Sequence, residues 1–416
     1  MKRLASLLTM LVVMTGMVMG QGNTAQVTQQ GTNDTSNVTQ SGTNNYAEYS
    51  VYGDDNFFMG EQDNSMKEEG AGNDMKVDQA NWFDVSNYGN RVRAIQEGAG
   101  NDLDAILKGD ENNITFKQEG RSNVIRGPGG APVSTFTEDP FKYNGDRSMI
   151  HVEQIGFQNV VVGDIQGSNQ VVDIYQESAT DVDDNYSEVM IRGSLGSPST
   201  QTVDVDQVGQ NESDIDIWGD GNSVTHDQYG GDDAGDPEKG TNVATTEIHG
   251  DGNTSWIEQE GLRNEATHMI GNSDVTGNEA RTIQDGRDNV AEVEQLSNDN
   301  YARQVQDAWN GISGTLDDNQ EAEMNESYIT QQGGVGNSAE TYQFGDGNYV
   351  DIMQDGANNT AITDQGIWDQ ERPAATGFMS THSDNNMIDI DQTGFGHTAE
   401  VIQIGSSNSS TISQSN

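Results

Sequence analysis

An eleven-residue repeat runs through nearly the whole chain and limits its possible folds more than any other feature. Each repeat begins with a seven-residue unit that has asparagine first, small or apolar residues third and fifth, and glutamine last; about four turn residues follow. Examples are NTSWIEQ (253–259) and NVAEVEQ (289–295). We find about 28 clear units and three weaker ones at 123–129, 310–316 and 376–382, which makes about 31 in total. Such a repeat predicts a solenoid or array rather than independent domains.

The seven-residue unit alternates in polarity, which is typical of a β-strand and not of a helix. In the unit 253–259, Asn253, Ser255, Ile257 and Gln259 share one face, and the acidic and bulky residues lie mostly on the other. Such strands are too short and too poor in apolar residues to be stable alone. Stacking them about 4.8 Å apart pairs their backbone groups and places like side chains over like.

The stacked units predict buried ladders of side-chain amides, in which each asparagine or glutamine satisfies the next. An unpaired amide in such a ladder would cost about 1–3 kcal/mol. The predicted ladder residues are Asn23, Gln29, Gln40, Asn90, Gln96, Asn112, Gln118, Asn253, Gln259, Asn264, Gln284, Asn289, Gln295, Asn348, Gln354, Asn359, Gln365, Gln392, Gln403 and Gln414. Some units have an aliphatic residue in place of the final glutamine, which indicates a buried position and not a reactive one: Val51, Leu107, Ile165, Ile191, Ile217, Ile248, Ile270 and Leu316.

The turns between units have their own residue pattern. Gly261 supplies a position that tolerates positive φ, and we expect Asn264 to adopt the left-handed conformation or to bond its own backbone. The predicted turn glycines are Gly31, Gly42, Gly98, Gly120, Gly261, Gly286, Gly345, Gly356, Gly394 and Gly405. Insertions are expected to interrupt the turns, and to decorate the rim of the stack, at 63–72, 130–147, 177–184, 229–241, 317–324 and 366–375.

Composition excludes several classes of function. Apolar residues make up 32% of the chain and the mean hydropathy is -0.75, so disorder would be the default reading without the periodicity. The chain has no cysteine, which excludes disulfides, a thiol nucleophile and a Cys-ligated metal. Its net charge of -49 argues against binding to nucleic acid or to anionic membranes.

Residues 1–20 have the pattern of a secretory signal peptide. Lys2 and Arg3 precede an apolar run from Leu4 to Met19, and this run is shorter than the roughly 18–20 residues that a membrane anchor needs. We therefore expect export, with residues 21–416 forming one repeat domain.

Two longer segments carry a family resemblance. QDGRDNVAEVEQ (284–295) and QDGANNTAITDQ (354–365) have the spacing Gln-x-Gly-x-x-Asn-x-Ala-x-x-x-Gln. This closely resembles the curlin repeat of curli, the secreted functional amyloid of bacterial biofilms, and the resemblance covers nearly all of the predicted mature chain. It marks Gln284, Gly286, Asn289, Ala291 and Gln295 as ladder positions. Unlike common family members, this chain begins its repeats at Asn23, which leaves almost no N-terminal targeting segment.

The resemblance implies a fold and a set of partners. The fold is an all-β, two-stranded parallel β-solenoid with two eleven-residue units per coil, which gives about 15 coils for this chain. The partners are a nucleator subunit, an outer-membrane secretion pore and a periplasmic chaperone.

No catalytic or metal-binding motif stands out. The six histidines lack metal-ligand spacing, and we expect His226 and His268 to be inward-facing and hydrogen-bonded. Acidic segments that could supply oxygen ligands to calcium are GDGN at 219–222, 250–253 and 345–348 and DVDDN at 181–185. The calcium-binding nonapeptide repeat, however, has a different period from the eleven-residue repeat of this chain. Solvated acidic turns are therefore the favoured interpretation. Thr24, Thr28, Thr35 and Thr39 begin an array suited to ice binding, but it ends at the third unit.

We therefore predict a non-enzymatic structural protein without cofactors, exported to form extracellular fibres at the cell surface. Its main partner would be itself, the N-terminal unit of one subunit against the C-terminal unit of the next, by strand addition. The alternative is a calcium-binding or ice-binding secreted β-solenoid adhesin.

Overall fold

The computed structural model describes residues 23–32, 34–54, 56–63, 73–79, 91–108, 113–126, 141–144, 149–157, 159–166, 170–177, 186–192, 201–208, 211–217, 219–230, 241–271, 275–307, 324–365 and 385–416. Every regular element in these residues is a β-strand. The predicted signal peptide lies outside them.

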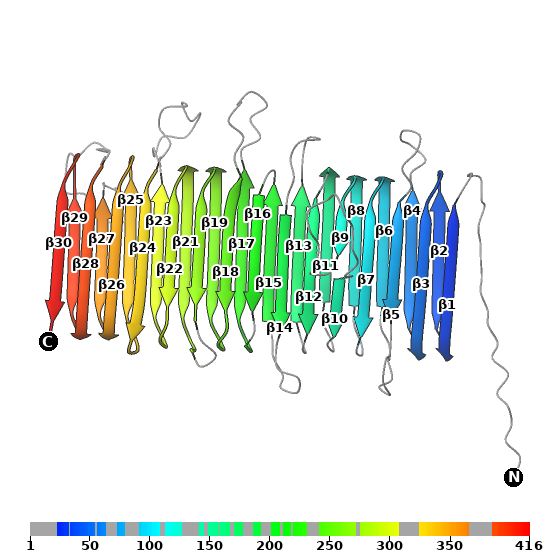
Figure 1. The fold of residues 1–416 in the computed structure, drawn as a ribbon, viewed down its shortest axis with the longest axis horizontal. Helices are drawn as coiled ribbons and strands as arrows, with labels where there is room; N and C mark the ends of the chain where they lie inside the picture. Colours follow the sequence, from blue (N-terminus) through cyan, green and yellow to red (C-terminus); the bar gives the residue numbers. More distant parts are fainter. Residues whose placement is uncertain are drawn as a thin grey trace, which may run out of the picture.

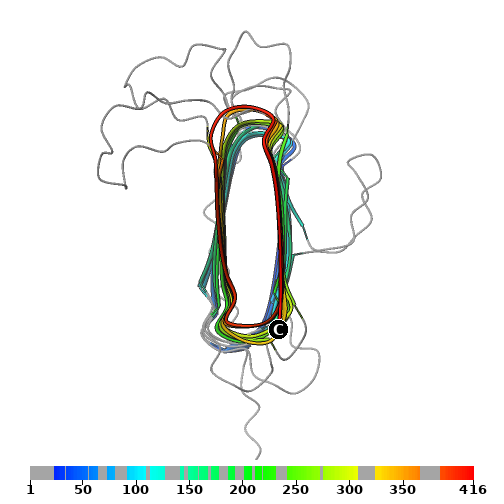
Figure 2. The ribbon, with the colours of Figure 1, turned by 90° about the vertical axis from the view of Figure 1, so that its left-hand side faces the viewer.

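The strands form two long sheets, and the chain passes from one sheet to the other between consecutive strand positions. Figure 1 shows the strands side by side along the length of the molecule. Seen along that length, the coils superpose as a flattened ring with two straight sides (Figure 2). Each strand pairs in parallel with the strand one coil away in its own sheet. The all-β fold with long parallel sheets is thus confirmed, and its winding is that of a solenoid.

The first sheet, called sheet I, contains 16 strands. Their bounds are β1 (Thr24–Thr32), β3 (Tyr46–Asp54), β5 (Asp74–Gln79), β7 (Asp102–Lys108), β9 (Val124–Arg126), β10 (Phe141–Asn144), β12 (Val160–Gln166), β14 (Tyr186–Arg192), β16 (Asn211–Ile217), β18 (Asn242–Ile248), β20 (Glu265–Ile270), β22 (Val290–Gln295), β24 (Glu326–Gly333), β26 (Tyr349–Ala357), β28 (Met387–Phe395) and β30 (Ser409–Ser415).

The second sheet, called sheet II, contains 14 strands. Their bounds are β2 (Thr35–Ser41), β4 (Phe57–Asp63), β6 (Arg91–Ala99), β8 (Asn113–Arg121), β11 (Met149–Phe157), β13 (Gln170–Glu177), β15 (Gln201–Val208), β17 (Ser223–Gly230), β19 (Thr254–Leu262), β21 (Glu279–Arg287), β23 (Tyr301–Asp307), β25 (Ser338–Phe344), β27 (Thr360–Gln365) and β29 (Thr398–Gln403).

The register of the sheets places equivalent repeat positions over one another. In the pairing of β19 with β21, Gln259 lies opposite Gln284 and Gly261 lies opposite Gly286. Where no insertion intervenes, as between Gln284 and Gln306, paired residues are 22 positions apart, which is two repeats. Because side chains alternate along a strand, a slip by one residue would turn every inward amide outward, so this register is strongly specified.

Alternate residues of each strand point inward and are buried. In β19, Ser255, Ile257 and Gln259 are buried, whereas Thr254 is exposed and Glu258 is half-buried. The predicted inward and outward faces are therefore confirmed for this unit. The core combines aliphatic and aromatic side chains from both sheets with rows of buried asparagine and glutamine. Among the described residues, no Asp, Glu, Lys or Arg is fully buried.

Two of the three weak repeat units, 310–316 and 376–382, lie outside the described residues. The described strands on either side of them are direct neighbours in the sheets: β22 pairs with β24 and β23 with β25, and β26 pairs with β28 and β27 with β29. Strands that are neighbours in a sheet can therefore lie more than two repeats apart in the sequence, as Gln306 and Gln343 do.

The third weak unit, 123–129, is confirmed in part: Val124–Arg126 form strand β9, and residues 127–129 lie outside the described residues. Strand β10 occupies the remainder of the same position in the sheet. Residues Val160–Val162 of β12 lie opposite β9, and Asp164–Gln166 lie opposite Lys142–Asn144 of β10. The insertion expected at the turn 130–147 therefore divides a strand. Of the other five predicted insertions, three overlap the end of a strand, at Asp63 of β4, Glu177 of β13 and Tyr229 of β17.

Candidate functional site: amide ladders along the solenoid

An unbroken ladder of glutamines runs through sheet II. Each side-chain Nε2 donates to the Oε1 of the next glutamine, in the direction of the C-terminus, over 2.7 to 3.3 Å. The series is Gln40, Gln62, Gln96, Gln118, Gln154, Gln176, Gln207, Gln228, Gln259, Gln284, Gln306, Gln343, Gln365 and Gln403. All glutamines predicted for this ladder belong to it, and the same spacing would have identified the others.

The second amide hydrogen of these glutamines connects the two sheets. Gln284 Nε2, for example, donates to Gln306 Oε1 at 2.9 Å and also to the backbone oxygen of Glu265 in sheet I at 2.9 Å. The carboxamide therefore uses both hydrogens and its oxygen, although it is buried. Because burying an amide without partners is costly, satisfaction along the ladder makes a polar core stable.

The equivalent ladder in sheet I is interrupted. Glutamines continue from Gln295 through Gln331, Gln354 and Gln392 to Gln414. Toward the N-terminus, however, Ile270 lies opposite Gln295, and Ile248 and Ile217 follow as fully buried residues. The predicted burial of these three isoleucines is thus confirmed.

Two buried amide atoms without partners mark where the sheet I ladder is broken. Gln295 Oε1 faces the isoleucine rows and has no donor. Gln29 Nε2 has no acceptor, because Val51 lies opposite Gln29 in the next strand. Since each glutamine donates toward the C-terminus, a block that begins after an aliphatic residue lacks a donor for its first oxygen, and a block that ends before one lacks an acceptor.

The asparagine ladder holds the start of each strand. Asn264 Oδ1 accepts the backbone N–H of Asn289 at 3.2 Å, and Asn289 Oδ1 accepts that of Asn325 at 3.1 Å. Asn264 Nδ2 donates to the backbone oxygens of Glu260 and Gly286. Predicted Asn23, Asn253, Asn348 and Asn359 make equivalent bonds. Asn90 and Asn112 lie outside the described residues.

The turn geometry decides between the two alternatives for Asn264, whose side chain bonds the nearby Glu260 backbone oxygen. Gly261 has a φ of 101°, as expected, but the second left-handed residue is Arg263 at 55°, not Asn264. The residue before the ladder asparagine recurs in this conformation, for example as Asp288 and Asn358, because it reverses the chain while the asparagine itself faces inward. Of the other predicted turn glycines, positive φ is found at Gly42, Gly98, Gly286, Gly345, Gly356, Gly394 and Gly405. Gly31 and Gly120 lie in β1 and β8, opposite Gly53 and Gly98.

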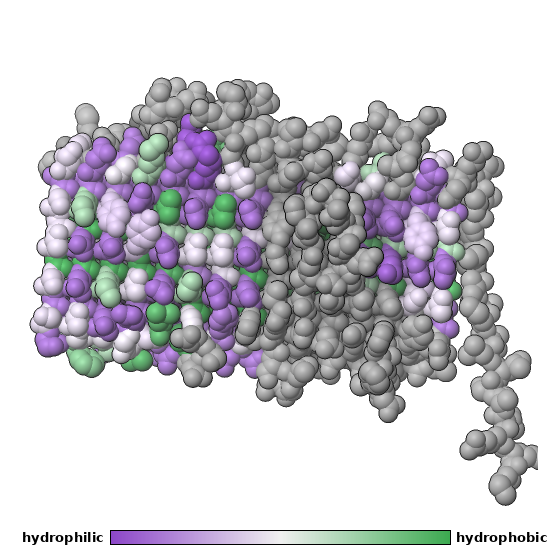
Figure 3. Space-filling view, viewed as in Figure 1, coloured by the Kyte–Doolittle hydropathy of each residue, from purple (hydrophilic) through white to green (hydrophobic). Residues whose placement is uncertain are grey.

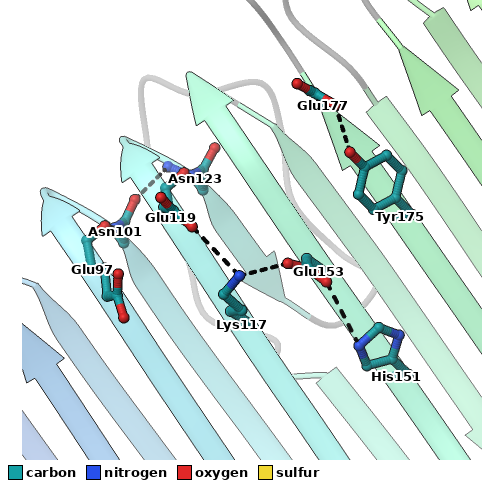
Figure 4. A network of polar contacts seen from close by, with 9 residues as sticks. All are labelled: Glu97, Asn101, Lys117, Glu119, Asn123, His151, Glu153, Tyr175 and Glu177. Carbon is teal, nitrogen blue, oxygen red and sulfur yellow. Dashed lines mark hydrogen bonds and ion pairs between the residues drawn. The ribbon is translucent and has the colours of Figure 1, made fainter.

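The outward faces carry stacked polar side chains. Figure 4 shows Lys117 between Glu119 and Glu153, with N–O distances of 3.4 and 2.6 Å, and His151 beside Glu153. In sheet II, Asp206 lies opposite Asp227. Burial, followed by repulsion from Asp227 and its neighbours, raises the pKa of Asp206. The described part of the face in Figure 3 has hydrophilic and hydrophobic residues interspersed along the strands.

The acidic turns do not assemble a cation site in the described residues. No group of three or more His, Asp or Glu there could hold a metal ion. Asp251 Oδ1 instead accepts the backbone N–H of Asp220 at 2.7 Å, so this carboxylate caps the neighbouring turn. The segment 181–185 lies outside the described residues. In the described part of the chain, no helix is long and apolar enough to cross a membrane.

A family comparison matches two segments of the chain. Residues 334–366 and 384–415 match the model of the curlin associated repeat. These segments carry curlin-like repeats. They contain β25 to β27 and β28 to β30, where the described ladder positions of both sheets are occupied by glutamine, as in Gln343 and Gln354. No curated protein matches the chain. The curlin resemblance is thus supported for the C-terminal coils.

Proposed function

We propose that the protein is a secreted structural subunit that self-assembles into extracellular, curli-like amyloid fibres. The observation that carries this proposal is the sheet II ladder, in which thirteen successive glutamine bonds all have the same donor-to-acceptor sense. Such a ladder can be extended at either end by an identical coil. The curlin-like repeats at 334–366 and 384–415 support the same conclusion.

The ladder also gives assembly a direction. At the N-terminal side of the described stack, Gln40 has donated to Gln62, so its oxygen is the group that an added coil would meet. At the other side, the glutamine ladder of sheet I has the same sense: Gln414 has accepted from Gln392 and donates one hydrogen to the Thr398 oxygen, so an added coil would meet its other hydrogen. Joining the N-terminal coil of one subunit to the C-terminal coil of another pairs donors with acceptors, whereas joining like ends does not. Added backbone hydrogen bonds would follow the parallel pattern already present.

Secretion and the further partners remain part of this proposal. The pattern of residues 1–20 supports export, and the curlin resemblance supports a secretion pore, a periplasmic chaperone and a nucleator. The fibre would belong to a biofilm matrix. Among the described residues, nothing favours the alternatives: Thr24 and Thr28 lie opposite Tyr46 and Ser50, so the outward threonine row ends after one strand.

The test is assembly by the purified chain without residues 1–20. Incubated in buffer, it should form filaments visible by negative-stain electron microscopy, and aligned filaments should give a meridional reflection near about 4.8 Å. A matched chain with lysine in place of Gln284, Gln306 and Gln343 should not form them, because charges would enter the ladder. Monodisperse rods from the unmodified chain at all concentrations would refute the proposal.

A further inference from the structure

A second hydrogen-bonded series runs through the middle of the core, independent of the ladders. His226 and His268 are fully buried, and each ring is held between two hydroxyl groups. His226 Nδ1 lies 2.6 Å from Ser213 Oγ, and its Nε2 lies 2.8 Å from Thr246 Oγ1. The series crosses repeatedly between the sheets and consists of Ser213, His226, Thr246, Ser255, His268, Thr282 and Gln304.

Gln304 determines the direction of every bond in this series. Its Nε2 donates to the backbone oxygens of Glu292 and Ser327, so its Oε1 faces Thr282 as an acceptor. Thr282 must then donate its only hydroxyl hydrogen to Gln304 and accept a hydrogen from His268 Nε2. Burial lowers the pKa of His268 and keeps the ring neutral, so its single hydrogen is on Nε2 and its Nδ1 accepts from Ser255.

The same reasoning continues to the second histidine. Ser255 has given its hydrogen to His268, so Thr246 must donate to Ser255. Thr246 in turn accepts from His226 Nε2, which leaves His226 Nδ1 to accept from Ser213. Both imidazoles are therefore neutral and fully satisfied. A proton added to either ring would arrive at a nitrogen that already faces a donated hydroxyl hydrogen.

The surroundings offer no charge to balance an added proton. Burial lowers the pKa of both His226 and His268 to about 3. The charged and titratable groups on the strands packed around them lie on the outward faces: Asp204, Asp206, Glu212, Asp214, Asp216, Asp227, Tyr229, Glu247, Glu258, Glu260, Glu265, Glu279, Arg281, Asp285, Arg287, Glu292 and Glu294. The inward neighbours are hydroxyl, amide and aliphatic side chains.

We propose that the coils from β16 to β21 form a proton-operated opening point, at which mild acid loosens the solenoid in its middle while the coils of the ladder near the C-terminus stay closed. Opening lets the two imidazoles reach water, where they can take up protons that the closed core excludes. This device does not depend on the proposed fibre function, because the series lies within one chain.

The expected size of the effect follows from linkage. An opened histidine binds a proton near its ordinary pKa, about 6.5, whereas the closed one does so near about 3. As pH falls between these values, the opening equilibrium constant therefore rises about tenfold per pH unit for each histidine, or about 100-fold per unit for both. The outward carboxylates with raised pKa, such as Asp206 and Asp227, act in the opposite direction, mainly below about pH 5.

Hydrogen exchange of the full chain, read by mass spectrometry from pH 7.5 to 4.5, tests the proposal. After correction for intrinsic exchange rates, protection in β16–β21 should fall steeply below about pH 6. Protection in β24–β27, which contain no histidine, should change little in that range. Replacement of both histidines, His226→Gln with His268→Gln, should remove the difference, and His151→Gln should retain it, because His151 lies at the surface beside Asp173. Equal pH profiles for the two segments of the unmodified chain would overturn the proposal.

A second measurement does not require the variants to fold. In ¹⁵N-histidine spectra of the unmodified chain at pH 7.5, where the core is closed, the rings of His226 and His268 should be neutral with hydrogen on Nε2. Hydrogen on Nδ1 at these two positions would also overturn the proposal.

Discussion

Gln306 and Gln295 provide a matched test of the amide ladders, because the same substitution leaves different numbers of groups unpaired. Methionine is unbranched and close to glutamine in size, so Gln306→Met and Gln295→Met keep the shape of the side chain while removing its hydrogen bonds. Both residues are fully buried. The gain from burying a more apolar side chain is therefore similar in the two variants and cancels in the comparison.

In the unbroken ladder, Gln306 accepts from Gln284 and donates to Gln343. Its loss removes two side-chain bonds and the bond to the Val290 oxygen, and it leaves Gln343 Oε1 without a donor and one amide hydrogen of Gln284 without an acceptor. At the ladder end, Gln295 Oε1 has no donor to lose. Its replacement removes one side-chain bond and the bond to the Glu279 oxygen. Gln331 Oε1 then lacks a donor in place of Gln295 Oε1, so the number of unpaired ladder oxygens does not change.

The difference between the variants is the bond from Gln284, whose loss leaves an amide hydrogen unpaired, and one additional unpaired oxygen. With about 1 kcal/mol for the bond and about 1–3 kcal/mol for the buried oxygen, Gln306→Met should be about 2–4 kcal/mol more destabilising than Gln295→Met. Guanidinium denaturation of the freshly purified chain, followed by circular dichroism, measures this as a difference in midpoint at equal slope. If the two variants have the same midpoint, the reasoning from ladder continuity is refuted.

Three further predictions concern charge and assembly. Asp206→Asn should stabilise the chain at pH 7 by up to about 1 kcal/mol, because the raised pKa of Asp206 means that its ionised form is disfavoured in the fold. The gain in stability, measured by thermal denaturation, should vanish as pH falls below about 4. A gain that does not depend on pH would contradict this cause. With a net charge of -49, subunits should polymerise faster as salt screens their repulsion, which turbidity or dye kinetics can follow. Rates unaffected by ionic strength would contradict the role of this repulsion. A much greater acceleration by millimolar calcium than by magnesium at equal ionic strength would contradict the interpretation that the acidic turns are only solvated. Fusion of a folded, bulky domain after Asn416 should block elongation seen by electron microscopy while circular dichroism retains the β-sheet signal; fibres of unchanged axial repeat from that fusion would argue against end-to-end addition.

The sequence by itself determined the strand, its inward face and its stacking partners by residue type. The period of two within NTSWIEQ (253–259) is a local property, because alternate side chains of any strand point to opposite faces. Identical spacing in successive units then favours placing like over like, and Gln259 indeed bonds Gln284. The burial of Ile270 at a glutamine position could likewise be predicted, since only a buried site accepts both residue types.

Neighbouring coils, the breaks in the sheet I ladder and the buried hydrogen-bonded series could not be predicted in this way, because they depend on how the chain winds in three dimensions. Repeat spacing alone does not show that β22 pairs directly with β24, whose paired glutamines Gln295 and Gln331 are 36 positions apart rather than 22. The unpaired Gln295 Oε1 depends on which strand lies opposite, not on its own unit. His226 meets Ser213 across the core, 13 residues away in the other sheet. The sequence of a single repeat unit predicts that its histidine faces inward. The residue that this histidine contacts depends on how the two sheets face each other, because contacts across the core join residues whose separation in the sequence is not specified by the repeat.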